Sequence, residues 1–217
     1  MADTRWVNAL HGAQSVVVFD LGGVLIDWNP RYLYRSLFDG DDEQMEWFLA
    51  NVTTQEWNSE QDRGRPWDEA VSTLVALHPD RADLIRAYHE RWTEMLGGAH
   101  EDTLAVLERL RSTGVRLFAL TNWSAETFVH AAERFPFLAW FEGLVVSGQE
   151  RIAKPDPRIF QLLLDRYELD PSQVVYIDDH APNVRVAAAL GMDAIRFTDA
   201  QQLESELANR GLMSPAT

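Results

Sequence analysis

A series of short apolar runs, separated by helical patterns, most constrains how this chain can fold. The first is Ser15 to Asp20 (SVVVFD), and similar runs occur at 115–120, 144–146, 174–177 and 194–197. Short β-branched runs of this kind are typical of parallel strands buried on both faces. Helical patterns lie between most of them, at 101–111, from Asp156-Pro157 onward, and at 182–190 before Gly191. The alternation predicts an α/β fold, a doubly wound, Rossmann-like parallel sheet with right-handed crossovers.

Residues 29–97 interrupt this alternation directly after the first strand. They have helical periodicity, four of the eight tryptophans and no convincing strand. Helices are expected at 30–38, 42–51, 66–77 and 81–96. The sequence therefore predicts an inserted α-helical cap at 29–97 on an α/β core formed by 1–28 and 98–217, with Gly97-Gly98 as the return hinge.

Composition narrows the classes of partner. A formal charge of −15 and a pI of about 4.7 disfavour nucleic acid and anionic membranes as partners. Cysteine is absent, which excludes disulfides and thiolate metal sites. No apolar signal core or membrane-length run is present, so the expected location is cytoplasmic. The oligomeric state cannot be inferred from the sequence.

Polar residues follow the predicted strands at the points where ligands bind to α/β sheets. Asp20-Leu21-Gly22-Gly23 follows the first strand, Thr121-Asn122 the second, and Asp178-Asp179 the fourth, while Lys154 precedes the intervening helix. Because the carboxyl ends of parallel strands share one edge, these side chains are expected to meet.

Three carboxylates in one place repel each other unless a cation compensates them. Mg²⁺ prefers carboxylate ligands completed by water and phosphate oxygens, so Asp20, Asp178 and Asp179 are candidate metal ligands. An aspartate can also act as a nucleophile that accepts a phosphoryl group. Lys154, Thr121 and Asn122 are candidates to bind phosphoryl oxygens, and the glycine at 23 allows the backbone to approach a ligand closely.

The segments FDLGGVLID, LTN, AKPDPRIF and YIDDHAPNV, in this order, resemble the four motifs of the haloacid dehalogenase superfamily. The position of the insert is similar to that superfamily's small helical cap. The resemblance implies that Asp20 is the nucleophile, that Thr121 and Lys154 bind and activate the phosphate, and that Mg²⁺ is the cofactor. It also implies that the metal is held by Asp20, Asp178, Asp179 and the backbone carbonyl of Gly22.

Gly22 departs from the phosphatase pattern, in which a second aspartate at this position acts as general acid. A positioned acid contributes roughly 10²–10⁴-fold in rate. The leaving group can be good enough without it, as an anomeric sugar oxygen or an acyl carboxylate is. Alternatively, His180 or a cap residue protonates it, or the chain is a poor phosphatase. Bacterial glucose 1-phosphate phosphatases resemble this chain in DLG-V, in the motif from Asp178 to Asn183 and in a segment similar to 58–64.

The leading hypothesis is a magnesium-dependent phosphatase acting on a small phosphorylated metabolite, such as a sugar phosphate. The first alternative is a 2-haloacid dehalogenase, which uses the same aspartate without metal, although Gly22 and the acidic pair argue against it. The second is a pseudo-phosphatase that binds its ligand without turnover. Trp28 and Trp123 flank the predicted site, where they either line it or pack in the core.

Overall fold

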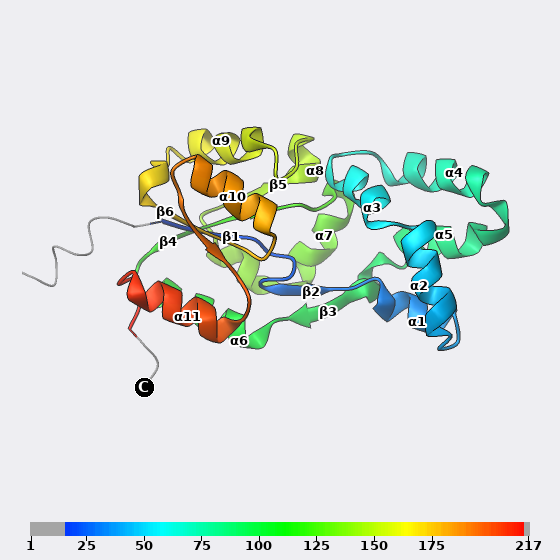
Figure 1. The fold of residues 1–217 in the computed structure, drawn as a ribbon, viewed down its shortest axis with the longest axis horizontal. Coiled ribbons are helices and arrows are strands. Elements are labelled where there is room, and N and C mark those ends of the chain that lie inside the picture. Colours follow the sequence, from blue (N-terminus) through cyan, green and yellow to red (C-terminus); the bar gives the residue numbers. More distant parts are fainter. Residues whose placement is uncertain (1–15, 215–217) are drawn as a thin grey trace, which may run out of the picture.

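The computed structural model describes residues 16–214 and contains a five-stranded parallel sheet (Figure 1). Its strand order is β5-β4-β1-β6-β7, with β1 in the centre. The strands are β1 (Val16–Phe19), β4 (Arg116–Thr121), β5 (Gly143–Val146), β6 (Val174–Asp178) and β7 (Asp193–Arg196). The predicted doubly wound α/β sheet is confirmed; Ser15, predicted to start the first strand, lies outside the described residues.

Helices cover both faces of this sheet, as the separation of α9 and α10 from α6 and α11 in Figure 1 shows. The helices are α6 (Glu101–Ser112), α7 (Ala125–Arg134), the one-turn α8 (Ser147–Glu150), α9 (Pro157–Arg166), α10 (Ala181–Ala189) and α11 (Ala200–Asn209). Successive β1 residues point to opposite faces. Val17 and Phe19 join one core cluster with side chains of α6 and α11, whereas Val16 and Val18 join another with those of α9.

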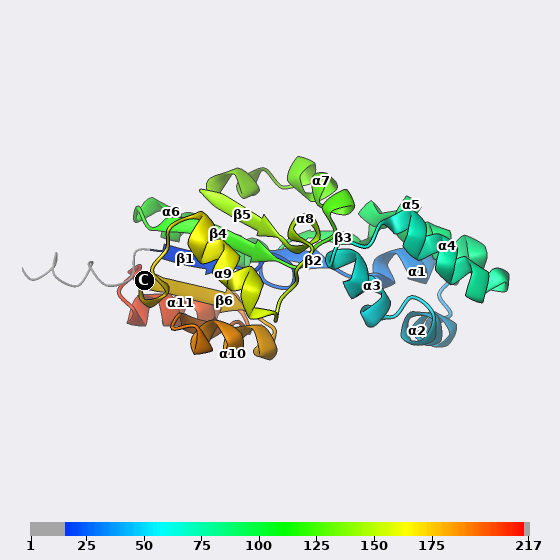
Figure 2. The same cartoon turned by 90° about the horizontal axis from the view of Figure 1, so that it is seen from above.

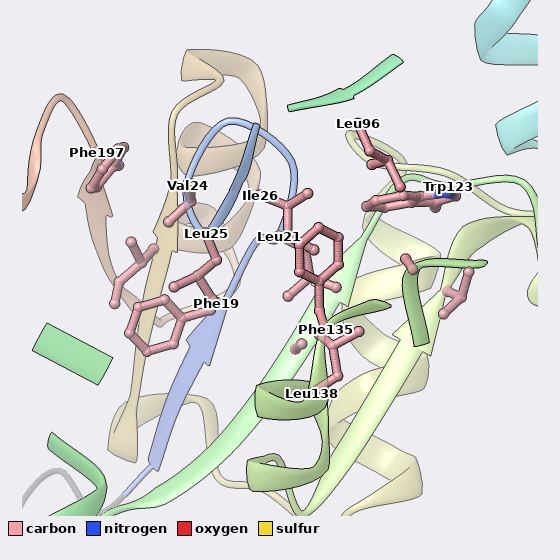
Figure 3. Close-up of a cluster of buried hydrophobic side chains, with 14 of the residues drawn as sticks. Phe19, Leu21, Val24, Leu25, Ile26, Leu96, Trp123, Phe135, Leu138 and Phe197 are labelled. Carbon is pink, nitrogen blue, oxygen red and sulfur yellow. The ribbon is translucent and has the colours of Figure 1, made fainter. Parts of the chain in front are cut away.

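The first of these clusters continues past the end of β1 toward the carboxyl edge of the sheet. Leu21 and Ile26, in the loop and strand after β1, pack in the same cluster as Phe19 (Figure 3). Trp123, which follows β4, lies at the far side of this cluster beside Leu96 (Figure 3). The apolar core therefore supports the loops that carry the predicted site residues.

A second group of helices lies beyond the carboxyl ends of the strands (Figures 1 and 2). It comprises α1 (Arg31–Leu37), α2 (Asp42–Asn51), α3 (Gln55–Asp62), α4 (Trp67–Leu77) and α5 (Ala82–Glu90). The chain enters this group through β2 (Ile26–Trp28) and leaves it through β3 (Leu96–Ala99), which pair antiparallel. The indole of Trp67 donates to the Ser124 hydroxyl at 3.0 Å, so this group also contacts the start of α7 directly.

Three predictions about residues 29–97 were wrong in detail. The helix expected at 81–96 ends at Glu90, and a short 3₁₀ turn (Trp92–Met95) leads into β3. The absence of strand was also wrong, because β3 begins at Leu96. Its strand conformation depends on pairing with β2, a contact across about 70 residues that local patterns do not report.

The third error was the omission of α3. The Thr54 hydroxyl caps this helix by accepting from the Trp57 N–H at 3.1 Å, and the helix itself is short and strongly polar. A helix without a continuous apolar stripe gives little periodicity signal. Among the described residues, no helix is long and apolar enough to span a membrane.

Candidate active site

Asp20 is held at the carboxyl end of the central strand. Its backbone N–H donates to the Ile177 carbonyl at 2.8 Å, which extends the pairing of β1 with β6 by one residue. Its carboxylate accepts from the Leu21 N–H at 2.7 Å, and the residue is only 8% exposed. The backbone of the next residue therefore holds the carboxylate in one orientation at the end of the strand.

Lys154 reaches the same point from the loop before α9. Its ammonium lies 2.9 Å from Asp20 Oδ2 and 2.8 Å from Asp178 Oδ2, and it also donates to the Leu120 carbonyl at 2.9 Å. Asn122 holds this loop on both sides of the lysine backbone, because its Nδ2 donates to the Lys154 carbonyl and its Oδ1 accepts from the Lys154 N–H. In this structure, the Asn122 side chain, which was predicted to bind phosphate, instead fixes the backbone of Lys154.

Asp178 is fully buried and is hydrogen-bonded on both oxygens. Oδ2 accepts from the Tyr176 hydroxyl at 2.5 Å, and Oδ1 accepts from the His180 N–H at 2.8 Å. The Asn183 amide donates to both oxygens at 3.0 Å. Tyr176 was not among the predicted site residues, because its partner lies two positions along the same strand and the contact requires both side chains to turn toward the strand end.

The two glycines after Asp20 differ in what surrounds them. Gly23 has φ +75°, and a Cβ there would lie 2.8 Å from Asp179 Oδ2. Gly22 has no atom within 4 Å of the corresponding position. Gly23 therefore makes room for a carboxylate, whereas Gly22 leaves open space.

The acidic residues fit a divalent cation. Asp20, Asp178 and Asp179 each offer one oxygen, and these oxygens all lie within 4.8 Å of one another. Three ionised carboxylates carry three negative charges, and Lys154 compensates one of them. A doubly charged cation would compensate the other two. Hard oxygen donors at such spacing suit Mg²⁺ or a similar cation.

In the metal-free protein, burial and neighbouring charges shift the pKa values of all three carboxyl groups. Burial raises the pKa of Asp20 to about 7, with Lys154 opposing the shift and Asp178 adding to it. Burial also acts on Asp178, but the Lys154 ammonium and the Tyr176 hydrogen bond hold its pKa below the ordinary value. Burial and the Asp178 charge raise the pKa of Asp179. A cation among the three would favour their ionised forms.

A cavity of about 460 Å³ lies in front of these groups, between the core and the helices of residues 31–95. The core contributes Asp20, Gly22, Asn122, Lys154 and His180, and the opposite wall includes residues of α3. The indoles of Trp28, Trp67, Trp92 and Trp123 also line it. The cavity is therefore lined by three of the residues expected to act on a phosphoryl group, Asp20, Asn122 and Lys154.

Several buried polar atoms of the site and the cavity walls have no hydrogen-bond partner within the described part of the chain. The Thr121 hydroxyl, the Asn183 Oδ1 atom and the indole N–H groups of Trp28 and Trp123 are of this kind. Buried polar atoms are normally hydrogen-bonded, so unpaired ones beside a cavity favour a polar ligand. Of the predicted site residues, Asp20, Gly22, Asn122 and Lys154 line the cavity, whereas Gly23, Thr121, Asp178 and Asp179 lie behind or beside this lining. Gly23 contributes by leaving space for the Asp179 carboxylate.

The amino-acid sequence of this chain is similar to those of several known proteins. The mouse acyl-CoA dehydrogenase family member 10 is 27% identical over 94% of this chain, which spans only 20% of that protein. The sesquiterpene phosphatase astK of Aspergillus oryzae is 27% identical, over 84% of this chain and 89% of its own length. (S)-2-haloacid dehalogenase 1 of Pseudomonas is also 27% identical, over 52% of this chain and 48% of its own.

A haloacid dehalogenase family enzyme of Bacteroides thetaiotaomicron, solved as a magnesium complex, has the same fold. It superposes with a TM-score of 0.66 at 22% identity, over 86% of this chain and 94% of its own. The family model for haloacid dehalogenase-like hydrolases matches residues 14–191, which include every residue of the predicted site. The chain therefore belongs to the haloacid dehalogenase-like hydrolase family and is an enzyme of the hydrolase class.

Proposed function

We propose that this protein is a magnesium-dependent phosphatase that hydrolyses a small phosphorylated metabolite through an aspartyl phosphate on Asp20. The observation that carries the proposal is the cluster of three carboxylates beside one buried lysine, of which Asp20 and the lysine line a cavity. A dehalogenase needs the nucleophile alone, whereas this cluster has the donor set of a cation site. The domain arrangement proposed with it is a core of 1–28 and 98–217 and a cap of 29–97.

In this proposal, Asp20 Oδ attacks phosphorus while Lys154 neutralises charge on the phosphoryl oxygens. The unpaired Thr121 hydroxyl donates a hydrogen bond to one of those oxygens. Asp20, Asp178, Asp179 and the Gly22 carbonyl would hold Mg²⁺, which supplies further positive charge against the phosphate when bound. Water then attacks the aspartyl phosphate and releases inorganic phosphate and free Asp20.

The remaining walls of the cavity favour a metabolite with both apolar and hydrogen-bonding surface. Four indoles and the polar face of α3 enclose the space beyond the carboxylates. Aromatic rings with convergent polar groups suit a sugar ring, whose faces are apolar and whose edges carry hydroxyls. We propose a sugar phosphate, including anomeric phosphates, as the substrate, and the cytoplasm as the location.

The test is hydrolysis of 4-nitrophenyl phosphate with Mg²⁺ by the wild type, by Asp20→Asn and by the wild type in EDTA. The expected result is release of 4-nitrophenol by the wild type alone, with activity restored when Mg²⁺ is added back after EDTA. Glu56→Gln, an exposed change on α3, is the control and should retain full activity. Activity in Asp20→Asn or in EDTA would overturn the proposal, and chloride release from 2-chloropropionate without metal would favour the dehalogenase alternative.

A further inference from the structure

One face of α3 forms the wall of the cavity opposite the nucleophile. Gln55, Asn58, Ser59 and Asp62, which share this face, line the cavity together with Asp20 and Lys154. In-line displacement directs the leaving oxygen away from the attacking atom. A leaving group expelled by Asp20 therefore points away from the core floor and toward this wall.

Asp62 contributes the carboxyl group of that wall. The Asn58 amide donates to its Oδ2 at 3.4 Å, and the N–H of Ser124 at the start of α7 also faces it. Burial raises the pKa of Asp62 to about 7, while the Ser124 N–H and the Arg63 charge act in the opposite direction. A carboxylic acid with this acidity is protonated in about half of the molecules at neutral pH and can readily release that proton.

The charged and titratable groups around Asp62 come from several elements. Arg63 neighbours it on the chain, and the Tyr88 hydroxyl of α5 interacts with it electrostatically. Asp20, Lys154 and His180 face the same cavity from the core. His180 follows the acidic pair on the core side, whereas Asp62 is on the side toward which the leaving group points.

Gly22 leaves the usual position of the general acid without a side chain. Its hypothetical Cβ meets no atom within 4 Å, so the space next to this position is open. We propose that Asp62, on α3, donates the proton to the leaving oxygen in place of the missing acid at Gly22. This inference rests on the proposed phosphatase function and assigns its acid.

In the first step, Asp20 Oδ forms a bond to phosphorus and the bond from phosphorus to the leaving oxygen breaks. The electron pair stays on that oxygen, which takes the proton of Asp62 and departs as a neutral alcohol. In the second step, the Asp62 carboxylate takes a proton from the water that attacks phosphorus, and the bond between phosphorus and Asp20 breaks. Asp62 is then protonated again and Asp20 is ionised, so both groups return to their starting states.

The test compares Asp62→Asn with the wild type on two substrates that differ in leaving group. A simple alkyl phosphate such as glycerol phosphate has a strongly basic leaving oxygen and needs the proton, whereas 4-nitrophenolate is stable as an anion. The expected loss of kcat is about 100-fold or more on the alkyl phosphate and only slight on 4-nitrophenyl phosphate. Glu56→Gln on the same helix is exposed and should behave as the wild type on both.

A double variant makes the assignment sharper. Gly22→Asp places a carboxyl in the open space two residues after Asp20, so Gly22→Asp combined with Asp62→Asn should recover alkyl phosphate hydrolysis. Equal losses on both substrates would show a positioning role and overturn the inference, as would unchanged alkyl phosphate turnover in Asp62→Asn. A wild type that hydrolyses only the aryl ester would also overturn it, with the phosphatase function intact. A wild type inactive on both esters would overturn the proposed function itself.

Discussion

Adjacent glycines in the loop after β1 offer a matched pair of substitutions with opposite expected results. Gly23→Ala introduces a methyl group at φ +75°, where its Cβ would lie 2.8 Å from Asp179 Oδ2. Gly22→Ala introduces the same methyl group into open space at an ordinary φ. Both variants remove one glycine from the same loop, so the loss of backbone freedom in the unfolded chain is the same for each.

The magnitudes follow from these two environments. The left-handed conformation costs an alanine about 1–2 kcal/mol, and Asp179 must also move away from the new methyl group. For a chain of this size, this places the Tm of Gly23→Ala roughly 2–8 °C below that of Gly22→Ala. Gly22→Ala should leave the stability unchanged or raise it by about 0.4–1 kcal/mol through the unfolded state.

Thermal unfolding in EDTA measures the backbone effect without metal, and calorimetric titration with Mg²⁺ measures the effect on Asp179. We expect Gly23→Ala to have the lower Tm and to bind Mg²⁺ more weakly, while Gly22→Ala retains both properties. Equal destabilisation by the two alanines would refute the geometric reasoning. Unchanged Mg²⁺ affinity in Gly23→Ala would refute the role of Asp179 as a ligand.

Three further predictions concern the charges and indoles of the site. Lys154→Met leaves Asp20 and Asp178 buried without their counter-ion and should lower the free energy of unfolding in urea by about 3–5 kcal/mol, whereas Arg158→Met, at an exposed ion pair, should change it little. In metal-free protein, Asp20 has a pKa of about 7 against an ordinary 3.8, so the folded state retains this proton longer and stability should fall as the pH rises from 4 to 7. That fall should be smaller in Asp20→Asn; an identical pH profile in urea unfolding would contradict the assigned shift. Trp123→Phe removes an unpaired buried N–H and should raise KM for a sugar phosphate while kcat changes little, and an unchanged KM would exclude this donor from substrate binding.

Local patterns are sufficient for the core and for the residues on its edge. A short apolar run that is followed by an acidic or hydroxyl residue indicates both the strand and the group at its carboxyl end. Asp20, Thr121 and Asp178 were located in this way, and their strands lie side by side in the sheet. The alternation of strands with helices brings these ends together, because parallel strands share one direction.

Contacts between distant segments could not be read from such patterns. The β2–β3 pair and the hydrogen bonds of Asn122 to the Lys154 backbone both depend on which distant segments lie side by side after folding. The polar helix α3 carried too few apolar residues to be recognised. Asp62 was therefore missed, although the segment 58–64 had been singled out by resemblance.

The amino-acid sequence by itself determined the α/β core and pointed to the proposed nucleophile, the lysine and the acidic pair. The strands and the carboxylates depend on strand-forming runs and on the residues directly next to them, and Lys154 was recognised from its own segment before α9. All of these are properties of neighbouring positions. Only the tertiary structure decided the surroundings of Asp62 and the difference between Gly22 and Gly23. Burial and close approach are set by segments far apart in the chain, and it is burial that shifts the pKa of a carboxyl group.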